Sequence, residues 1–204
     1  MAKLKLSKKI RIPKTHHEDY LHEMGFKKIA GVDEVGRGAW AGPLVAGAVI
    51  LNRRLYGLRD SKMLSAYKRE KLAQKIKRTS KWGIGEASVA ELNKLKLTKG
   101  TQLAFRRAIA ALKVNCDFIL ADGFFFDSPL PCRALKKGDM ICSSIAAASI
   151  VAKVYRDKLM RKLDKKIKGY NFSSHKGYGT KKHQKTLKKL GPSSEHRMFY
   201  KSLK

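Results

Sequence analysis

The chain has few acidic residues, few cysteines and no long apolar run, and each shortage excludes a class of protein. No apolar run among the 204 residues reaches the length of a membrane span. The basic stretch from Met1 to Lys14 lacks the apolar segment of a secretory signal. The three cysteines, Cys116, Cys132 and Cys142, are odd in number, and no pair has metal-ligand spacing. We therefore expect reduced thiols in a cytoplasmic protein.

Acidic residues are scarce because basic residues dominate the charge. Asp and Glu number 16 against 46 Lys and Arg, and the formal net charge is +30. Such an excess attracts polyanions, and neutralising phosphates releases counterions, which makes the affinity sensitive to salt. Nucleic acid is the partner that this composition favours, although a solubility trait or an adaptation of the whole proteome would give the same excess. Each carboxylate that stands in a motif is therefore informative.

Short apolar runs alternate with amphipathic segments, a pattern that predicts an α/β layer fold. The expected strands cover residues 29–32, 44–51, 82–87 and 117–122. The expected helices cover residues 66–78, 101–113, 143–167 and 181–190. The Ala-rich first half of the 143–167 helix predicts tight packing against the sheet. Gly83 and Gly85 predict bulges or close contacts within their strand.

Two of the expected strands end in carboxylates, the first at Asp33 and Glu34 and the last at Asp122. Ligands gather at the carboxyl ends of strands in open α/β sheets, so neighbouring strands would place Asp33 and Asp122 side by side. Crowded carboxylates repel unless a cation lies among them, and hard oxygen ligands select Mg²⁺ or Mn²⁺. Spacing alone leaves the alternative open that each Asp is a turn or cap residue.

Several ordered segments resemble the type 2 ribonucleases H, specifically ribonuclease HII. The first is Gly31-Val-Asp-Glu-Val-Gly-Arg-Gly-Ala-Trp-Ala-Gly-Pro43. The others, in chain order, are Asp60–Ser65, Gly83–Ser88, Lys137–Lys153, His175–Thr180 and Gly191-Pro-Ser. The likeness covers roughly residues 28–197, and several motifs in one order are far more specific than a single motif.

The resemblance implies a ribonuclease H-like fold: a mixed central sheet flanked by helices, with a short C-terminal helical segment. It implies a basic N-terminal arm at 1–27, a catalytic domain at 28–168 and a basic substrate-binding segment at 169–204. The implied protein is a monomeric endoribonuclease that hydrolyses the RNA strand of RNA–DNA hybrids and cuts 5′ of single ribonucleotides in duplex DNA, by two-metal-ion catalysis.

In the family that the chain resembles, four acidic residues hold Mg²⁺ or Mn²⁺. The matching positions are Asp33, Glu34, Asp122 and Asp139. Asp157, on the 143–167 helix, competes for the fourth place. We prefer Asp139 because it stands in the family's Lys-Gly-Asp context, and we expect Asp157 to pair with a neighbouring Lys or Arg. Asp60 is expected to organise a loop.

The resemblance assigns recognition of the ribose 2′-hydroxyl to the loop Gly36-Arg37-Gly38 and to Tyr178. Glycine lets backbone approach a sugar closely, and the 2′-hydroxyl distinguishes RNA from DNA. From the residues alone, Arg37 could instead pair with Asp33 or Glu34, and Tyr178 could be a surface aromatic.

Ser61, Lys62 and the basic tail are expected to contact phosphates, which positions a substrate without reading its sequence. Three histidines in that tail lack a shared ligand spacing, so we expect turn or surface residues rather than metal ligands or a general base. They are His175, His183 and His196.

Two other functions remain open at this stage. A ribonuclease HIII usually carries an extra N-terminal domain and a Glu in the fourth acidic place, whereas this chain has few residues before its first motif and offers Asp139. A non-catalytic basic protein that binds nucleic acid is disfavoured because all four acidic positions are intact.

Overall fold

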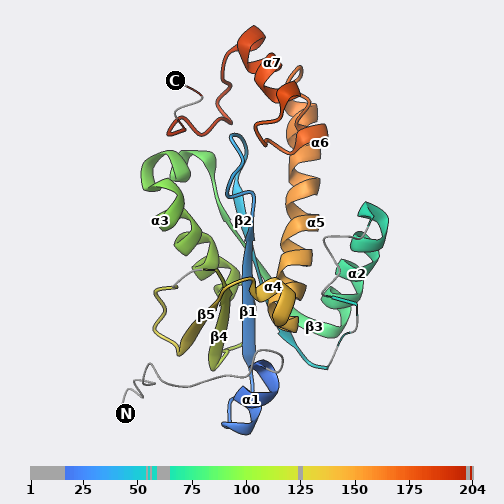
Figure 1. Ribbon diagram of the computed structural model, residues 1–204, viewed down its shortest axis with the longest axis vertical. Helices are drawn as coiled ribbons and strands as arrows, with labels where there is room; N and C mark the ends of the chain where they lie inside the picture. Colours follow the sequence, from blue (N-terminus) through green and yellow to red (C-terminus); the bar gives the residue numbers. More distant parts are fainter. Residues whose placement is uncertain are drawn as a thin grey trace.

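The computed structural model describes residues 17–53, 55, 57–58, 65–123, 126–200 and 203. Its centre is a five-stranded mixed sheet with the strand order β3-β2-β1-β4-β5 (Figure 1). The strands are β1 (Ile29–Val35), β2 (Leu44–Leu51), β3 (Ser80–Ala87), β4 (Phe118–Asp122) and β5 (Cys132–Leu135). The helices are α1 (His17–Glu23), α2 (Ala66–Thr79), α3 (Val89–Ala110), α4 (Gly138–Ile141), α5 (Ser143–Lys166), α6 (Phe172–His175) and α7 (Lys181–Leu190).

The four predicted strands and the α/β class are confirmed. β1 is the central strand, antiparallel to β2 and parallel to β4. β2 pairs antiparallel with β3, and β4 pairs parallel with β5. The sequence pattern missed β5, because this four-residue strand, Cys-Arg-Ala-Leu, carries no clear alternation of apolar and polar residues.

The predicted start of one helix was wrong, since α3 begins at Val89 rather than near residue 101. A capping box starts it: Ser88 Oγ accepts from the backbone nitrogen of Glu91, and the Glu91 carboxylate accepts from the backbone nitrogen of Ser88. The helix then kinks at Lys96, whose φ is +61°. The Ser-x-x-Glu spacing was the available signal, but the kink interrupts the apolar period on which the prediction relied.

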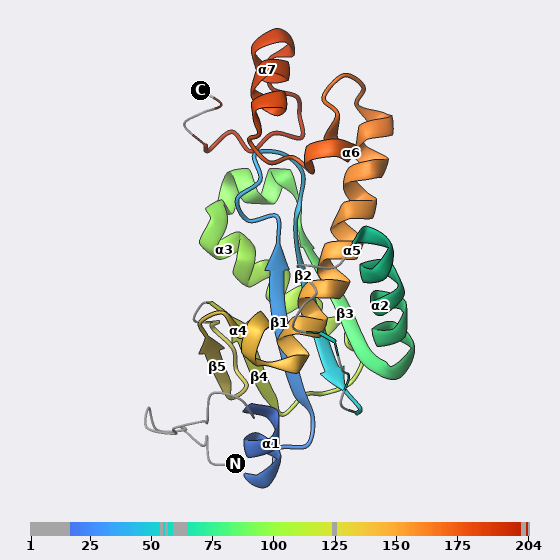
Figure 2. The ribbon, with the colours of Figure 1, turned by 45° about the vertical axis from the view of Figure 1, so that its right-hand side comes forward.

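Helices cover both faces of the sheet: α3 lies on one face, and α5 with α2 on the other (Figure 2). The predicted tight packing of the Ala-rich half of α5 is confirmed. A Cβ atom added to Gly47 would lie 2.4 Å from the Ala148 carbonyl oxygen. On the opposite face, a Cβ atom on Gly85 would lie 2.1 Å from the Ala104 carbonyl oxygen, as its predicted close contact requires. Small residues on strands and helices thus let the layers approach closely.

The C-terminal segment packs on the second half of α5, which extends past the sheet (Figure 1). Met160 of α5, Tyr170 and Phe172 form a small apolar cluster there with Ala41 of the β1–β2 loop. Isolated bridges join Ala39 to Tyr178 and Ala41 to His196. The β1–β2 loop is therefore held between the sheet and the C-terminal segment.

At the opposite end of the molecule, α1 supports the start of α5. Glu18 Oε1 accepts a hydrogen bond of 2.7 Å from the backbone nitrogen of Ser144. This side chain caps a helix whose own N-cap residue, Cys142, provides no side-chain cap. The sequence pattern did not anticipate α1, and the proposed division at 27 and 168 stays a prediction. Across the part of the chain that the structure describes, none of the helices is long and apolar enough to span a membrane.

Candidate active site

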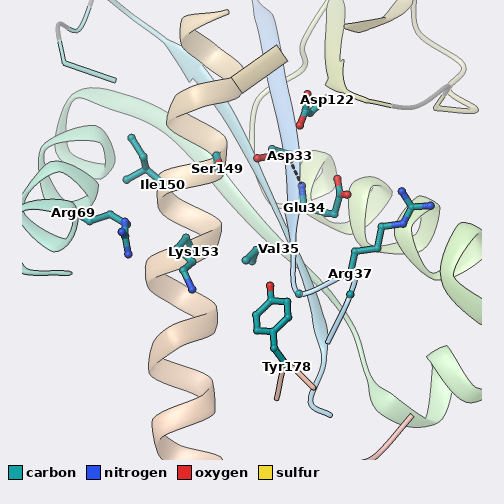
Figure 3. Close-up of a pocket in the computed structure, with 12 residues that line it drawn as sticks. Asp33, Glu34, Val35, Arg37, Arg69, Asp122, Ser149, Ile150, Lys153 and Tyr178 are labelled. Carbon is teal, nitrogen blue, oxygen red and sulfur yellow. Dashed lines mark hydrogen bonds between the residues drawn. The ribbon is translucent and has the colours of Figure 1, made fainter. Parts of the chain in front are cut away.

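Two carboxylates meet where the pairing of the parallel strands β1 and β4 stops. The last residue pair in their register is Val32 with Ala121, so Asp33 and Asp122 follow next to each other at one edge of the sheet (Figure 3). This is the placement that the strand ends predicted. Asp33 is 5% exposed, and its Oδ1 accepts a 2.7 Å hydrogen bond from the backbone nitrogen of Glu34. Glu34 is the next residue on the same strand and lines the same pocket.

Asp139 reaches this edge through α4. The backbone nitrogen of Gly138, the first residue of α4, donates to Asp122 Oδ1 at 2.6 Å. Asp139 follows directly and is buried, with 8% of its surface exposed. Asp157 instead forms an ion pair with Lys153 one turn earlier on α5, at 2.7 Å, which confirms the pairing expected for it.

Burial and the neighbouring carboxylates raise the proton affinity of Asp33 and Glu34. The pKa of Asp33 lies well above its ordinary value, first because the group is buried and then because Glu34 and Asp122 are negatively charged. Asp139 acts on Asp33 in the same direction, while a hydrogen bond from Ser149 of α5 opposes the shift. Burial likewise raises the pKa of Glu34 to about 7. A site with these properties favours added positive charge.

The residues present fit a hard divalent cation. All four side chains offer carboxylate oxygens, the ligands that Mg²⁺ and Mn²⁺ prefer. Glu34 Oε2 is buried and has no hydrogen-bond partner among the described residues. As the side chains stand, no three acidic, histidine or cysteine residues in the described ranges are close enough together to enclose an ion.

A pocket of about 370 Å³ opens beside the carboxylates. Its lining residues are Asp33, Glu34, Val35, Gly36, Arg37, Gly38, Arg69, Asp122, Ser149, Ile150, Lys153 and Tyr178. Basic side chains from α2 and α5 face it from the side away from Asp122 (Figure 3). Sequence reasoning missed three polar residues of this lining, Arg69, Ser149 and Lys153, and two apolar ones, Val35 and Ile150. The spacing of Ser149 and Lys153, four residues apart on a predicted helix, was the one signal that placed them on a common face.

Two buried arginines pack against the loop Gly36-Arg37-Gly38. Arg156 of α5 and Arg197 of the C-terminal segment are both 0% exposed. Arg197 donates to the carbonyl oxygens of Gly42 and Arg37, at 2.9 and 3.0 Å. Gly36 has a φ of +85°, and a Cβ atom there would lie 2.1 Å from Arg156 Nε. Only glycine fits this position, because the backbone conformation and the arginine both exclude a side chain.

Arg156 also links the end of the β1–β2 loop to the C-terminal segment. It donates to the carbonyl oxygens of Pro43, Ala41 and Lys176, at 2.9, 3.2 and 2.9 Å. Its guanidinium carbon lies 5.7 Å from the centroid of the Tyr178 ring, within reach of a cation–π interaction. In a chain with so many arginines, no local pattern marks the two that become buried.

Tyr178 faces the carboxylates across the pocket. Its hydroxyl points toward the end of the pocket that holds Asp33 and Glu34 (Figure 3). The Arg37 side chain extends away from Tyr178, and its charge lowers the pKa of Glu34 against the effect of burial. The structure thus brings the Gly36-Arg37-Gly38 loop, Tyr178 and three of the carboxylates to one pocket, whereas Asp139 is not among its lining residues. Ser61 and Lys62, the predicted phosphate contacts, lie outside the described residues, as does Asp60.

The expectation that the tail histidines are turn or surface residues is wrong about their burial. His175, His183 and His196 are 8%, 0% and 1% exposed and lie together beneath Tyr178. Their wide and irregular sequence spacing gives no periodic pattern, because a helix, a turn and an extended segment bring them together.

The chain is similar throughout to proteins of known type. The family model described as Ribonuclease HII matches residues 30–203. A ribonuclease HII of Thermus thermophilus is 46% identical over 170 residues, covering 83% of this chain and 84% of the relative. One of Cutibacterium acnes is 46% identical over 196 residues, covering 92% and 95%. The solved ribonuclease HII of Archaeoglobus fulgidus, in complex with PCNA, has a TM-score of 0.74 at 26% identity over 86% of this chain and 95% of that chain. This likeness confirms the expected fold.

Proposed function

Because the chain belongs to the ribonuclease HII family and is therefore a ribonuclease H-type endonuclease, we propose that it hydrolyses the RNA strand of RNA–DNA hybrids and cuts duplex DNA 5′ of single ribonucleotides. The products are a 5′-phosphate and a 3′-hydroxyl. One observation carries the proposal: the pocket that contains Asp33 and Asp122 also contains the Gly36-Arg37-Gly38 loop and Tyr178. Hydrolytic chemistry and recognition of a sugar thus share one cavity.

The proposed metal ligands are Asp33, Glu34, Asp122 and Asp139, holding two Mg²⁺ or Mn²⁺ ions. Such ions, when bound, supply an activated water and stabilise charge on the departing oxygen. The protein's part is to hold the ligands. Asp33 is fixed by the Glu34 backbone and by Ser149, and Asp122 is fixed by the Gly138 backbone. The mutual repulsion of the four groups supports a cation rather than a proton donor at this edge.

The sugar is proposed to lie between the Gly36-Arg37-Gly38 loop and Tyr178. A Cβ atom on Gly38 would meet no atom within 4 Å, so the space beside this glycine is open to a ligand. The Tyr178 ring offers a flat surface for stacking on a sugar or base, and its hydroxyl offers a hydrogen bond. A deoxyribose lacks the 2′-hydroxyl that these groups would hold, which gives the site a basis for discrimination.

Basic residues on three elements are proposed to contact the phosphates. Arg69 and Lys153 line the pocket from α2 and α5. The lysines of α7 are exposed and offer a further surface for the duplex; they are Lys181, Lys182, Lys185, Lys188 and Lys189. Ser61 and Lys62 keep their proposed role as phosphate contacts. Contacts of this kind predict salt-sensitive binding.

The enzyme is proposed to act in the cytoplasm as a monomer. All three cysteines are unpaired, with Cys116 and Cys142 buried and Cys132 partly so. Reduced thiols of this kind suit a reducing compartment.

The test is a cleavage assay with Mg²⁺ or Mn²⁺ on two substrates: a DNA duplex that contains one ribonucleotide, and a long RNA–DNA hybrid. We expect a cut 5′ of the single ribonucleotide and cleavage of the hybrid. Cleavage of hybrids only would indicate activity like that of ribonuclease HIII. Binding without a cut at every metal tried would overturn the proposal and leave a non-catalytic binding protein.

A further inference from the structure

Three buried histidines form a hydrogen-bonded cluster directly beneath Tyr178. His175 ends α6, His183 lies in α7, and His196 lies in the segment that follows α7. The rings of His175 and His183 are stacked with centroids 4.2 Å apart, and the centroid of the tilted His196 ring lies 5.3 Å from that of His183. A cluster of imidazoles this well buried must satisfy its polar atoms internally.

Backbone groups set the protonation of His175. The backbone nitrogen of Gly177 donates to its Nδ1 at 3.2 Å, so Nδ1 carries no proton. Its Nε2 lies 2.7 Å from the carbonyl oxygen of Tyr170, which can only accept, so Nε2 carries the proton. His175 is therefore neutral, with its proton on Nε2.

The same reasoning orders the other two rings into a chain. The backbone nitrogen of Ser193 donates to His196 Nδ1 at 2.9 Å, so the proton of a neutral His196 is on Nε2. That Nε2 lies 3.1 Å from His183 Nε2, which must accept. His183 then carries its proton on Nδ1, and this group lies 3.0 Å from the carbonyl oxygen of Tyr178. Donors run in one direction, from Ser193 through both rings to Tyr178.

We propose that His183 and His196 are positioning residues, which set Tyr178 against the Gly36-Arg37-Gly38 loop through this ordered chain of neutral imidazoles. The inference rests on the proposed function, because the residue that these imidazoles position, Tyr178, is the one proposed to contact the ribose.

Tyr178 is fixed at its backbone on both sides. Its carbonyl oxygen accepts a hydrogen bond from His183 Nδ1, and the backbone nitrogen of the preceding residue, Gly177, donates to His175 Nδ1. The Gly177 carbonyl in turn accepts from the backbone nitrogens of Trp40 and Ala41, at 2.8 and 3.2 Å. A turn held in this way transmits the position of the histidines to the β1–β2 loop and to the tyrosine ring, while leaving the hydroxyl open to the pocket.

The surroundings keep the rings neutral. Burial lowers the pKa of all three histidines, and burial together with nearby His183 lowers that of His196 to about 4. Lys182 and Lys176 lower the pKa of His175 further, whereas Asp164 raises it. A second proton on His183 would point at His196 Nε2 and force the His196 proton onto Nδ1, against the Ser193 N–H group.

The protonation of the three imidazoles can be tested directly by ¹⁵N NMR of the full-length protein labelled at histidine, at neutral pH. The chain contains six histidines, so the spectrum is simple to assign with single substitutions. We expect the Nδ1–H form for His183 and the Nε2–H form for His175 and His196, all neutral. An Nε2–H form of His183, or a charged ring at any of the three positions, would overturn the inference. This measurement does not depend on activity.

The positioning role is tested by two variants of His183. In His183→Asn the amide can still donate to the Tyr178 carbonyl, whereas in His183→Leu it cannot. We expect His183→Leu to lower kcat/KM on the single-ribonucleotide duplex about tenfold, the scale of one lost hydrogen bond. The change should lie mainly in KM, and His183→Asn should recover most of it. Equal losses in both folded variants would contradict the proposal.

A double-mutant cycle separates positioning from general damage. If His183 acts through Tyr178, His183→Leu should have little further effect in a Tyr178→Ala background. An undiminished loss in that background would show that the histidine acts elsewhere. If the wild-type protein cuts neither substrate, the proposed function has failed. The NMR result then still decides whether His183 and His196 form the ordered hydrogen-bonded chain.

Discussion

Asp122 accepts a 2.6 Å hydrogen bond from the backbone nitrogen of Gly138, and this bond brings Asp139 to the edge of the sheet where Asp33 lies. Residues from β1, β4 and α4 thereby form one acidic cluster, although Asp139 comes from a helix of only four residues.

The fourth acidic position can be decided by two matched substitutions. Asp139→Asn should lower kcat by at least about a hundredfold, because a ligand to the metals is lost. Asp157→Asn should keep most of the activity, since it breaks only the ion pair with Lys153 on α5. Steady-state cleavage of the single-ribonucleotide duplex measures both. Activity in Asp139→Asn together with its loss in Asp157→Asn would assign the site to Asp157.

Metal binding should be visible in stability as well as in activity. Asp33 is buried beside other carboxylates, so Mn²⁺ should bind the folded protein and not the unfolded chain. At about a hundred times its Kd, such a ligand adds about 2.7 kcal/mol to the free energy of unfolding. Asp33→Asn should melt at a higher temperature than the wild type in EDTA, since one buried charge is removed. The melting temperature of the same variant should rise little when Mn²⁺ is added. Thermal melts with and without the metal give both comparisons, and an equal metal effect in the two proteins would remove Asp33 from the site.

The buried guanidinium of Arg197 should be essential to the β1–β2 loop. Arg197→Met leaves the carbonyl oxygen of Gly42 without this donor, which costs about 1–3 kcal/mol, whereas the carbonyl oxygen of Arg37 keeps its hydrogen bond from the Tyr200 hydroxyl. We expect a lower melting temperature and a raised KM. Arg106→Met is the control: its ion pair with Asp127 is half exposed and contributes less than about 1 kcal/mol. Similar melting temperatures for the two variants would show that the buried Arg197 contributes no more stability than the exposed Arg106.

The histidine cluster should make the fold sensitive to acid. His196 has a pKa of about 4 when folded, below the value of about 6.5 expected when unfolded. As the pH falls, the unfolded chain takes up this proton first, so the stabilisation is complete above pH 6.5 and is lost between pH 6.5 and 4. The free energy of unfolding should decrease over that window, by at most about 1.4 kcal/mol per pH unit for each such group.

Urea unfolding in EDTA across this pH range measures the slope for the wild type and for His196→Asn. The variant keeps an acceptor for the Ser193 N–H group and should show a shallower slope. Buried carboxylates such as Asp33 and Glu34 act in the opposite direction, so the difference between the two proteins is the informative quantity. The exposed His22→Asn serves as a control. Identical slopes for wild type and His196→Asn would mean that the pKa of His196 is not lowered in the folded protein.

Much of the catalytic edge could be predicted because its signals are local. Asp33 and Asp122 each follow an apolar run, and the parallel pairing of β1 with β4, which stops just before them, places them side by side. The tight packing of α5 followed from its run of alanines. By contrast, β5 and α4 are too short to carry a periodic signal.

The sequence by itself determined the α/β class, the carboxylates at the strand ends and the family to which the motifs point. It did so because strand ends, caps and motifs are read over a few neighbouring residues. Only the tertiary structure decided that Arg156 and Arg197 are buried under the loop, and that His183 and His196 form one hydrogen-bonded chain that ends at the Tyr178 carbonyl. These contacts join residues far apart in sequence, so burial and hydrogen bonding at those positions depend on the packing of the whole fold and leave no local pattern.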